Sequence, residues 1–307
     1  MEIKTVNSNK YNSQELASSI VKNSSKHTYY TISLLVDKNL VNSCFMAYAY
    51  FRWVDDVVDD SNKTPSEIIT FITRQRKLID LFYNGGKPDT ISEKEMMLFH
   101  IINEDKEEDS FLQSYIRNFF AIIEFDSTRR NKIISEEKFA WYSQTLGKAV
   151  TDCIFYFIGN DYNYPESKRR YLAAEGAHIT HMLRDYIDDI NNNYFNIAKE
   201  FLDKYNIKPD SVDTQVFQQW VKDRVILARF YFKEGKKYIN RLRCLRTKIA
   251  AHWYCIRFEV ILDKIEKDRF LLRRKYSAHK KPPILFKMAW TAFKVSIKHL
   301  SVNVNNH

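Results

Sequence analysis

The chain has 307 residues, of which 45% are hydrophobic and 15% aromatic, and its formal net charge is +10. It contains only six Gly and six Pro, about a third of the average share of these turn residues. The scarcity excludes sandwiches, barrels and doubly wound sheets, which need frequent turns. The aromatic content excludes a disordered chain. No uncharged apolar run approaches the ~18 residues of a membrane span.

Apolar residues recur at intervals of three and four along most of the sequence, which is the period of amphipathic helices. We therefore predict an all-α protein in which long helices are separated by short polar loops. No linker or low-complexity segment divides the chain, so we expect one domain over residues 1–283, followed by a basic amphipathic helix and tail over 284–307. The expected helices cover residues 12–24, 41–60, 65–83, 91–103, 110–127, 135–158, 166–204, 211–240, 244–275 and 284–299.

Positive charge is concentrated towards the C-terminus, with 18 Lys and Arg against 4 Asp and Glu between Lys236 and Lys298. Such a segment attracts nucleic acid, an anionic lipid surface or a phosphate-bearing substrate. Nucleic acid is the weakest of these candidates, because no recognised binding module accompanies the charge. The last predicted helix could rest on an anionic membrane or dock on the domain's own core. One of its faces carries the residues Phe286, Ala289, Trp290, Phe293, Ile297 and Leu300.

Two negative observations bear on location and cofactors. The four cysteines lack the paired spacing of a metal site, and residues 1–16 lack the apolar block of a secretory signal. We expect reduced thiols in a cytoplasmic protein, peripheral to the membrane if the last helix binds lipid. No Gly-x-Gly-x-x-Gly fingerprint is present, so the sequence offers no NADPH motif.

A first acidic cluster follows an aromatic stretch that begins at Tyr48. Asp55 and Asp59 are four residues apart and share one helix face, with Arg52 and Tyr48 one and two turns earlier. Asp56 lies beside them. Like charges at this spacing destabilise a helix by about 0.2–0.5 kcal/mol per pair, so a bound cation would stabilise the cluster.

A second acidic cluster repeats this arrangement. Asp185 and Asp189 are again four apart, Arg184 immediately precedes the first of them, and His181 and His178 extend the same face. Mg²⁺ prefers carboxylate oxygens, keeps several waters and bridges to substrate phosphates. We expect the two clusters to converge on one pocket and to hold metal ions against a diphosphate. The plainer alternative is a pair of solvent-exposed acidic helix ends.

Both clusters lie within motifs of a known family. Tyr48–Asp59 resembles the Tyr-Ala-x-x-Arg-x-x-Asp-Asp-x-x-Asp motif of the squalene/phytoene synthase family, and Leu183–Asp189 resembles its Leu-Arg-Asp-x-x-x-Asp motif. Residues 25–35 resemble the family's N-terminal substrate segment, Tyr142 matches the tyrosine that opens its central helix, and Tyr254–Ile265 resembles its late helix. The resemblance implies a single-domain, all-α isoprenoid synthase fold around a central cavity.

The resemblance also implies an activity. It points to a transferase that condenses two C15 or C20 prenyl diphosphates head to head through a cyclopropyl diphosphate intermediate and releases diphosphate. The implied cofactor is Mg²⁺, with Mn²⁺ as the other candidate, and the oligomeric state, monomer or homodimer, stays open. We assign catalysis to Tyr142, Asp55 and Asp59. We assign substrate binding to Tyr48, Arg52, Arg184, Lys26 and Tyr29. We assign metal binding to Asp55, Asp56, Asp59, Asp185, Asp189 and His181.

Departures from the family pattern keep other activities open. His178 and His181 stand where the family usually has Gln and Asn, and imidazole suits transition metals better than Mg²⁺. Lys148 and Thr151 replace glycines of the central helix, which predicts a narrower or more polar cavity. Residues 191–197 replace a Gly-Arg-x-Tyr-Leu-Pro segment and lose a basic phosphate contact. The alternatives are a terpene cyclase or phosphohydrolase that ionises one prenyl diphosphate, and a non-catalytic protein that retains the fold.

Two other charged stretches could contact phosphate. Asp126–Arg130 follows an apolar helix, and Arg273–Lys275 lies in the basic C-terminal region. A helix C-terminus with cationic residues is the commoner explanation of the first stretch. A solvated surface is the commoner explanation of the second.

Overall fold

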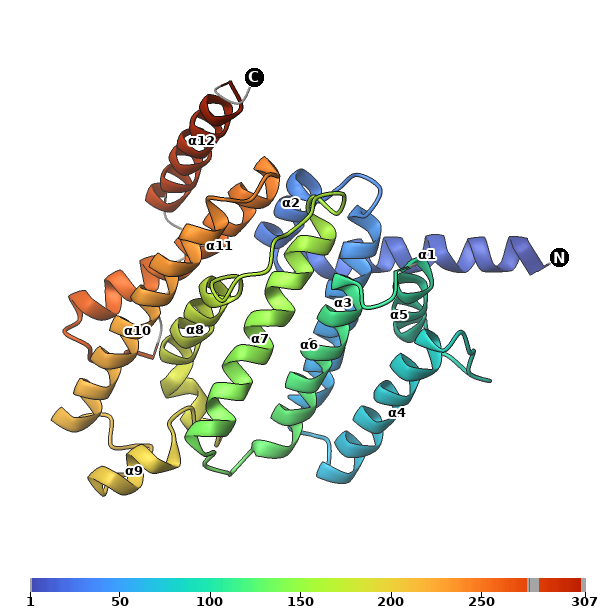
Figure 1. Cartoon of the computed structure of the whole chain (residues 1–307). Coiled ribbons are helices and arrows are strands. Elements are labelled where there is room, and N and C mark those ends of the chain that lie inside the picture. Colours follow the sequence, from blue (N-terminus) through green and yellow to red (C-terminus); the bar gives the residue numbers. More distant parts are fainter. Residues whose placement is uncertain (1, 106, 275, 277–281, 305–307) are drawn as a thin grey trace. The chain divides into compact units, whose positions relative to one another are not determined.

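The computed structural model describes residues 2–105, 107–274, 276 and 282–304 (Figure 1). In this part of the chain the structure consists of twelve α-helices and one isolated β-bridge, between Ile133 and Phe195. The predicted all-α class is therefore confirmed. The helices are α1 (Glu2–Ser24), α2 (Lys26–Leu35), α3 (Val41–Val58), α4 (Pro65–Tyr83), α5 (Glu93–Glu104), α6 (Phe111–Arg129), α7 (Glu136–Phe157), α8 (Leu172–Asn191), α9 (Lys199–Tyr205), α10 (Gln215–Ile239), α11 (Leu245–Lys267) and α12 (Pro282–Val304).

The chain divides into two compact units. The first contains residues 1–128 and 155–161, and the second contains residues 129–154 and 162–307. The first unit therefore holds α1 to α5 and most of α6, and the second holds most of α7 and all of α8 to α12. The single domain expected over residues 1–283 stays a prediction.

Helix α3 is the centre of the first unit, where α1, α2 and α5 pack against it. Its Tyr50 is fully buried, and the Tyr50 hydroxyl donates to Gln75 Oε1 of α4 at 3.1 Å. Gln75 in turn donates to Glu95 Oε1 of α5 at 2.9 Å, and Arg74 Nε donates to the same carboxylate at 2.7 Å. Buried polar groups that are fully paired fix neighbouring helices in one arrangement. This network holds α3 in place, and with it the acidic residues of its last turn.

Helix α8 is the centre of the second unit, where it packs against α10 and α11. Its buried face includes Leu183 and Tyr186, which join a core with Phe217 and Val221 of α10. The backbones of α8 and α10 approach closely at Gly235, where an added Cβ would lie 2.5 Å from the Ala173 nitrogen. Only glycine fits such an approach. The second acidic cluster therefore also lies on a helix that is fixed by its core.

The helix predicted over 166–204 is interrupted, and this is the main correction to the expected elements. Helix α8 ends at Asn191, Asn193 has a left-handed φ of 64°, and α9 begins only at Lys199. The intervening segment bonds to the residues before α7, with Asn131 N donating to Asn193 O at 2.8 Å and Lys199 N donating to Ile134 O at 2.9 Å. The segment contains neither Gly nor Pro, and its only local turn signal is the asparagine run 191–193, a residue type that tolerates a left-handed φ.

A second correction concerns residues 26–35, which form α2 although no helix was predicted there. Ser25 caps this helix, since its hydroxyl accepts a hydrogen bond from the Thr28 backbone nitrogen at 3.2 Å. A serine at this position satisfies one of the unpaired N–H groups of the first turn. The expected substrate segment is therefore helical.

Candidate active site

Both acidic clusters lie at the C-terminal ends of helices. Helix α3 ends at Val58 and Asp59 is its C-cap residue, while Asp189 lies in the last turn of α8. Neither of these two fully described helices has a basic residue in its last turn. A helix C-terminus carries partial negative charge, so carboxylates there are unfavourable for the isolated helix. A feature that opposes local stability in this way points to function.

At the end of α3 the carboxylate of Asp55 lies close to other negative charges. Asp55 reaches solvent, yet protein atoms crowd its carboxylate. This desolvation raises the pKa of Asp55 to about 6, helped by the negative charges of Asp59, Asp126 and Asp56 and opposed by Arg52. Carboxyl groups with raised pKa values of this kind are often found in catalytic and binding sites. A bound divalent cation would relieve the repulsion, so these residues fit Mg²⁺.

Arg52 makes its ion pair with Asp56, at 2.5 Å, and this pair is half exposed on both sides. The hydrogen bond to Asp56 raises the pKa of the guanidinium, although burial opposes the shift. Exposed ion pairs contribute only about 0–1 kcal/mol, so Arg52 can exchange this partner for a phosphate at little cost. Tyr48, one turn earlier, lies close enough to Arg52 to contribute to the raised pKa of its guanidinium.

Asp126 contributes to this site in a way that its sequence context does not indicate. The stretch Asp126–Arg130 suggests a phosphate contact, whereas Asp126 adds negative charge at Asp55. It lies near the end of α6, close to the Arg129 that ends this helix. Asp126 and Asp55 lie on different helices far apart in the sequence, so no local pattern indicated that their charges act on each other.

The two residues expected from the N-terminal substrate segment lie at the start of α2. Lys26 is exposed in the first turn. The Tyr29 ring stacks on Phe45 of α3, with ring centroids 5.2 Å apart and an interplanar angle of 13°, and Lys22 lies over its other side at 5.6 Å. Tyr29 therefore joins α2 to α3, and the substrate-binding role of both residues stays a prediction.

At the end of α8 the first carboxylate is strongly held. Asp185 accepts hydrogen bonds from Arg184 Nε at 2.6 Å and Arg184 Nη2 at 2.5 Å. His181 Nε2 lies 2.8 Å from the same carboxylate. Burial would raise the pKa of Asp185, but the hydrogen bonds from Arg184 and His181 hold it well below its usual range. Asp185 is therefore an anion with its positive partner already in place.

The second carboxylate of α8 connects to the expected catalytic tyrosine. Asn196 Nδ2 donates to Asp189 Oδ2 at 2.6 Å, and the buried Arg129 donates from Nη1 to Asn196 Oδ1 at 3.1 Å. The Arg129 guanidinium lies 5.2 Å from the centroid of the Tyr142 ring and 5.0 Å from that of Tyr194. Asn196 was not predicted as a site residue, although it follows Asp189 by only seven residues. Arg129 belongs to the stretch Asp126–Arg130, which the sequence suggested as a phosphate contact, but its contact with Asn196, 67 residues away, had no local signal.

His178 has a structural setting that differs from that of His181. It is buried, its Nδ1 lies 3.1 Å from Ser143 Oγ, and its ring contacts the Tyr142 ring edge-on at 4.7 Å. Burial lowers the pKa of His178 well below its usual value, and the charges of His181 and Arg129 act in the same direction. His178 is therefore neutral and packs against Tyr142. His181 is half exposed beside Asp185, and metal binding by it stays a prediction.

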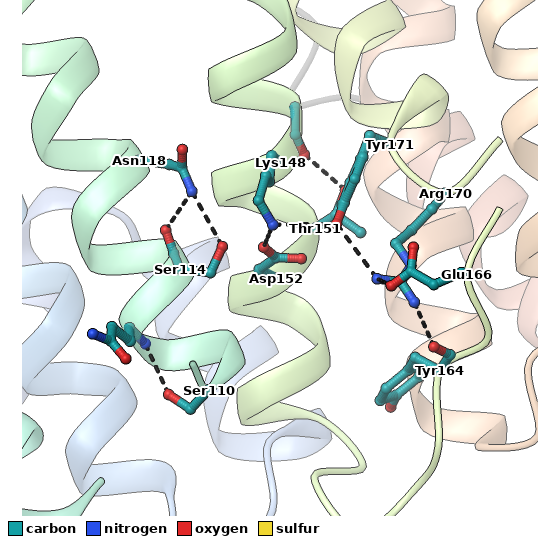
Figure 2. Close-up of polar contacts among 12 residues, drawn as sticks. Ser110, Ser114, Asn118, Lys148, Thr151, Asp152, Tyr164, Glu166, Arg170 and Tyr171 are labelled. Atoms are coloured by element: carbon teal, nitrogen blue, oxygen red, sulfur yellow. Dashed lines mark hydrogen bonds and ion pairs between the residues drawn. The ribbon is translucent and has the colours of Figure 1, made fainter. Parts of the chain in front are cut away.

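Lys148 and Thr151 of α7, which replace glycines of the family pattern, each make a hydrogen bond within the second unit (Figure 2). Lys148 Nζ donates to the buried Asp152 Oδ2 at 2.8 Å and lies 3.3 Å from the Tyr171 hydroxyl. The Thr151 hydroxyl donates back to Gly147 O at 2.8 Å. Lys148 is thus neutralised by an adjacent carboxylate and does not present a lone charge.

No group of three or more His, Cys, Asp or Glu side chains is arranged as a ready metal site within the described ranges. None of the helices that the structure describes has the length and hydropathy to cross a bilayer. The four cysteines are all free thiols.

Comparison with known proteins places this arrangement in a family. A family model described as squalene/phytoene synthase matches residues 21–282. The chain belongs to the squalene/phytoene synthase family. No curated protein matches its sequence significantly.

Solved structures show the same fold at low sequence identity. The squalene synthase HpnC from Alicyclobacillus acidocaldarius is similar at a TM-score of 0.66 and 14% identity, covering 85% of this chain and 96% of that one. A dehydrosqualene synthase in complex with a ligand has a TM-score of 0.66 and 15% identity, covering 95% and 98%. A ligand complex of the protein named TcSQS has a TM-score of 0.63 and 12% identity, covering 94% and 92%. The predicted isoprenoid synthase fold is therefore confirmed.

Membership of the squalene/phytoene synthase family supports a prenyltransferase of that type, acting on prenyl diphosphates. The two motifs that suggested the family lie at the ends of α3 and α8, which belong to different units. The convergence of their carboxylates and the central cavity between the helices stay predictions.

Proposed function

We propose that the protein condenses two C15 or C20 prenyl diphosphates head to head, with Mg²⁺, through a cyclopropyl diphosphate intermediate and with release of diphosphate. The observation that carries this proposal is the setting of Asp55 at the end of α3, where desolvation by crowding protein atoms and the negative charges of Asp59 and Asp126 raise the pKa of Asp55 to about 6. Family membership supports the same reaction.

The end of α3 would provide the first diphosphate site. Asp55 and Asp59 would hold Mg²⁺, with Asp56 available once Arg52 turns to phosphate. When bound, the metal stabilises the negative charge that develops on the leaving diphosphate. Arg52 supplies two parallel donors to phosphate oxygens. One unit-charge contact at ~4 Å contributes roughly 4 kcal/mol at an effective dielectric constant of 20, so a few such contacts lower the barrier to ionisation substantially.

The second unit would provide the other part of the site. Asp185 and Asp189 are the expected metal ligands, and Arg184 and His181 hold Asp185 ionised. Arg129, fixed by Asn196, puts a positive charge beside Asp189, where the family's usual basic residue is missing. The Tyr142 ring, packed by His178, offers an aromatic face. Such a face stabilises a carbocation by about 0.5–2 kcal/mol without bonding to it.

Product analysis tests the proposal directly. Purified protein is incubated with farnesyl or geranylgeranyl diphosphate and Mg²⁺, and the products are identified by mass spectrometry, with Asp55→Asn as the inactive control. A C30 or C40 product supports head-to-head condensation. A C15 or C20 hydrocarbon or alcohol instead identifies a cyclase or a phosphohydrolase and overturns the proposal.

The absence of any product from both substrates, with Mg²⁺ or Mn²⁺, would favour a non-catalytic protein that retains the fold. A binding measurement with the same diphosphates then distinguishes a lost reaction from a lost site. Binding that persists in wild-type protein and disappears in Asp55→Asn would show that the acidic cluster still serves as a diphosphate site.

A further inference from the structure

Helix α12 packs on α11 through one side (Figure 1). Among residues 284–301 of α12, Met288 is the most deeply buried at 4% exposure, and its carbonyl oxygen accepts a hydrogen bond from Trp253 Nε1 at 2.9 Å. Near the other end of α12, His299 Nδ1 lies 3.2 Å from Lys248 Nζ. The two contacts show that α11 and α12 run antiparallel. The packed side is therefore the one that carries Met288 and His299.

The large apolar side chains of α12 lie on a different side and are exposed. At 100° per residue these positions span an arc of about 140°. Their exposed fractions are Leu285 64%, Phe286 73%, Trp290 49%, Phe293 55%, Ile297 51% and Leu300 62%. Soluble monomers rarely expose a continuous apolar surface of this kind without a partner for it. We call these six residues the apolar face of α12.

A basic stripe separates the apolar face from the side that packs on α11. It consists of Lys287, Lys294 and Lys298, all exposed, and residues 282–304 contain no Asp or Glu. Lys294 Nζ lies 5.0 Å from the centroid of the Trp290 ring, at the edge of the apolar face. This combination of an apolar arc with flanking lysines is that of a helix which lies in the plane of a lipid surface.

The neighbouring end of α11 adds further positive charge. Because the helices are antiparallel, the start of α11 lies beside the end of α12, and Arg241 and Arg243 are exposed in the turn before it. Lys248 is close enough to Lys298 that burial and this like charge lower the pKa of Lys248. Crowded cations attract an anionic surface.

We infer that α12 binds anionic lipid membranes peripherally, with its apolar face in the headgroup region and its lysines on the lipid charges. Charge complementarity favours this partner over a second copy of the chain, since pairing two α12 helices would bring their basic stripes together without any acid between them. The inference does not depend on the proposed reaction, because the lipid-binding residues lie beyond residue 282, where the family match ends.

Vesicle flotation of the full chain tests this inference. The probes are vesicles of pure phosphatidylcholine and vesicles in which a third of the lipid is phosphatidylglycerol, each at low and high salt. We expect binding to the anionic vesicles and a marked decrease of the bound fraction at high salt, because the surface charges are screened. Equal binding to both vesicle types, or none to either, would overturn the inference.

Matched variants separate the two contributions. We expect Phe286→Ser/Phe293→Ser and Lys287→Glu/Lys294→Glu/Lys298→Glu each to lower the vesicle partition coefficient at least tenfold. The apolar control is Ile226→Ser/Phe230→Ser on α10, whose side chains are 56% and 53% exposed. The charge control changes three exposed lysines elsewhere in the chain, Lys168, Lys199 and Lys233, to Glu. Controls that lose binding as strongly as the α12 variants would contradict a specific role of this helix.

Two further measurements keep the result interpretable. Circular dichroism and Tm verify that the variants fold, which the exposed positions of the substitutions favour.

Quenching of Trp290 fluorescence by brominated lipid reports how deeply α12 enters the bilayer, and we expect Trp290→Phe to remove most of this quenching without loss of binding. Sedimentation equilibrium that shows a dimer broken by Phe286→Ser/Phe293→Ser, with no lipid binding, would assign the apolar face to a second copy instead.

Discussion

The C-terminal ends of α3 and α8 carry similar acidic motifs in opposite electrostatic states. At the end of α3, burial and neighbouring carboxylates raise the pKa of Asp55 to about 6. At the end of α8, the pKa of Asp185 lies well below its usual range, because hydrogen bonds from Arg184 and His181 outweigh the effect of burial. At the first end the arginine pairs with Asp56, whereas at the second it binds Asp185 itself.

The position of the arginine explains this difference. Arg52 is four residues before Asp56 and makes its ion pair there, which leaves Asp55 without a direct partner. Arg184 directly precedes Asp185 and binds both of its carboxylate oxygens. Asp55 can therefore accept a metal ion without breaking an ion pair, while Asp185 must first exchange one. We expect the first metal ion to bind at α3.

The largest effect should come from Asp55→Asn. We expect kcat to fall by about 10²–10³-fold, the size associated with losing one electrostatic contact to a developing anion. Steady-state turnover of prenyl diphosphate measures this. The matched control is Asp60→Asn in the same acidic run, whose Oδ1 caps the Asn62 backbone nitrogen. Similar losses in both variants would refute a specific role of Asp55.

A double variant tests whether the two acidic ends serve one site. Asp185→Asn should also lower kcat strongly. If both carboxylates act on the same metal–diphosphate group, the loss in Asp55→Asn/Asp185→Asn will be much smaller than the product of the single losses, since residues that act as a unit are not additive. Losses that multiply would instead show two independent sites and remove the expected convergence.

Arg129→Gln should destabilise the α8 side of the comparison. The variant loses the cation–π contacts with Tyr142 and Tyr194 and weakens the hydrogen bond to the buried Asn196. We expect the free energy of unfolding to fall by about 2 kcal/mol, measured by urea denaturation. The exposed Arg130→Gln is the control. If Arg129→Lys restores the free energy of unfolding but not the KM for the prenyl diphosphate, Arg129 has a positioning role in substrate binding.

His181→Asn introduces the residue that the squalene/phytoene synthase family usually has at this position. If the imidazole binds metal, the variant should shift the preference from Mn²⁺ towards Mg²⁺ several-fold, because imidazole suits transition metals better. The measurement is the ratio of kcat/KM values with the two ions. An unchanged ratio would assign His181 to holding Asp185 alone.

The smallest effect should be an increase in the free energy of unfolding when Asp55→Asn is measured without bound metal. A carboxyl whose folded pKa is raised to about 6 destabilises the protein above that pH, and the penalty disappears as pH falls towards the unfolded pKa near 3.8. We therefore expect Asp55→Asn to raise stability by about 0.5 kcal/mol at pH 7–8, the size of a surface like-charge pair, and not at all near pH 4. Thermal melts of both proteins across this range measure it, and a gain that grew on acidification would contradict the assignment.

The local sequence determined much of this protein. Sparse Gly and Pro with a helical period specified an all-α chain, and the spacing of Asp55 with Asp59 and of Asp185 with Asp189 located both acidic ends. These features were predictable because the helical period and the spacing of side chains on one face depend on neighbours within a few residues. The break between α8 and α9 was missed, because the asparagine run 191–193 is a weaker turn signal than Gly or Pro and the segment is held by bonds to residues 131–134.

Only the tertiary structure decided which charges meet. Asp126 acts on Asp55, and Arg129 bonds to Asn196, from distant segments whose approach no local pattern records. The same holds for α12, which has apolar residues on two sides: packing buried the side with Met288 and left Phe286 exposed. Hydrophobicity requires that some apolar side be buried, but which one is buried depends on the shape and bonding of the partner helix.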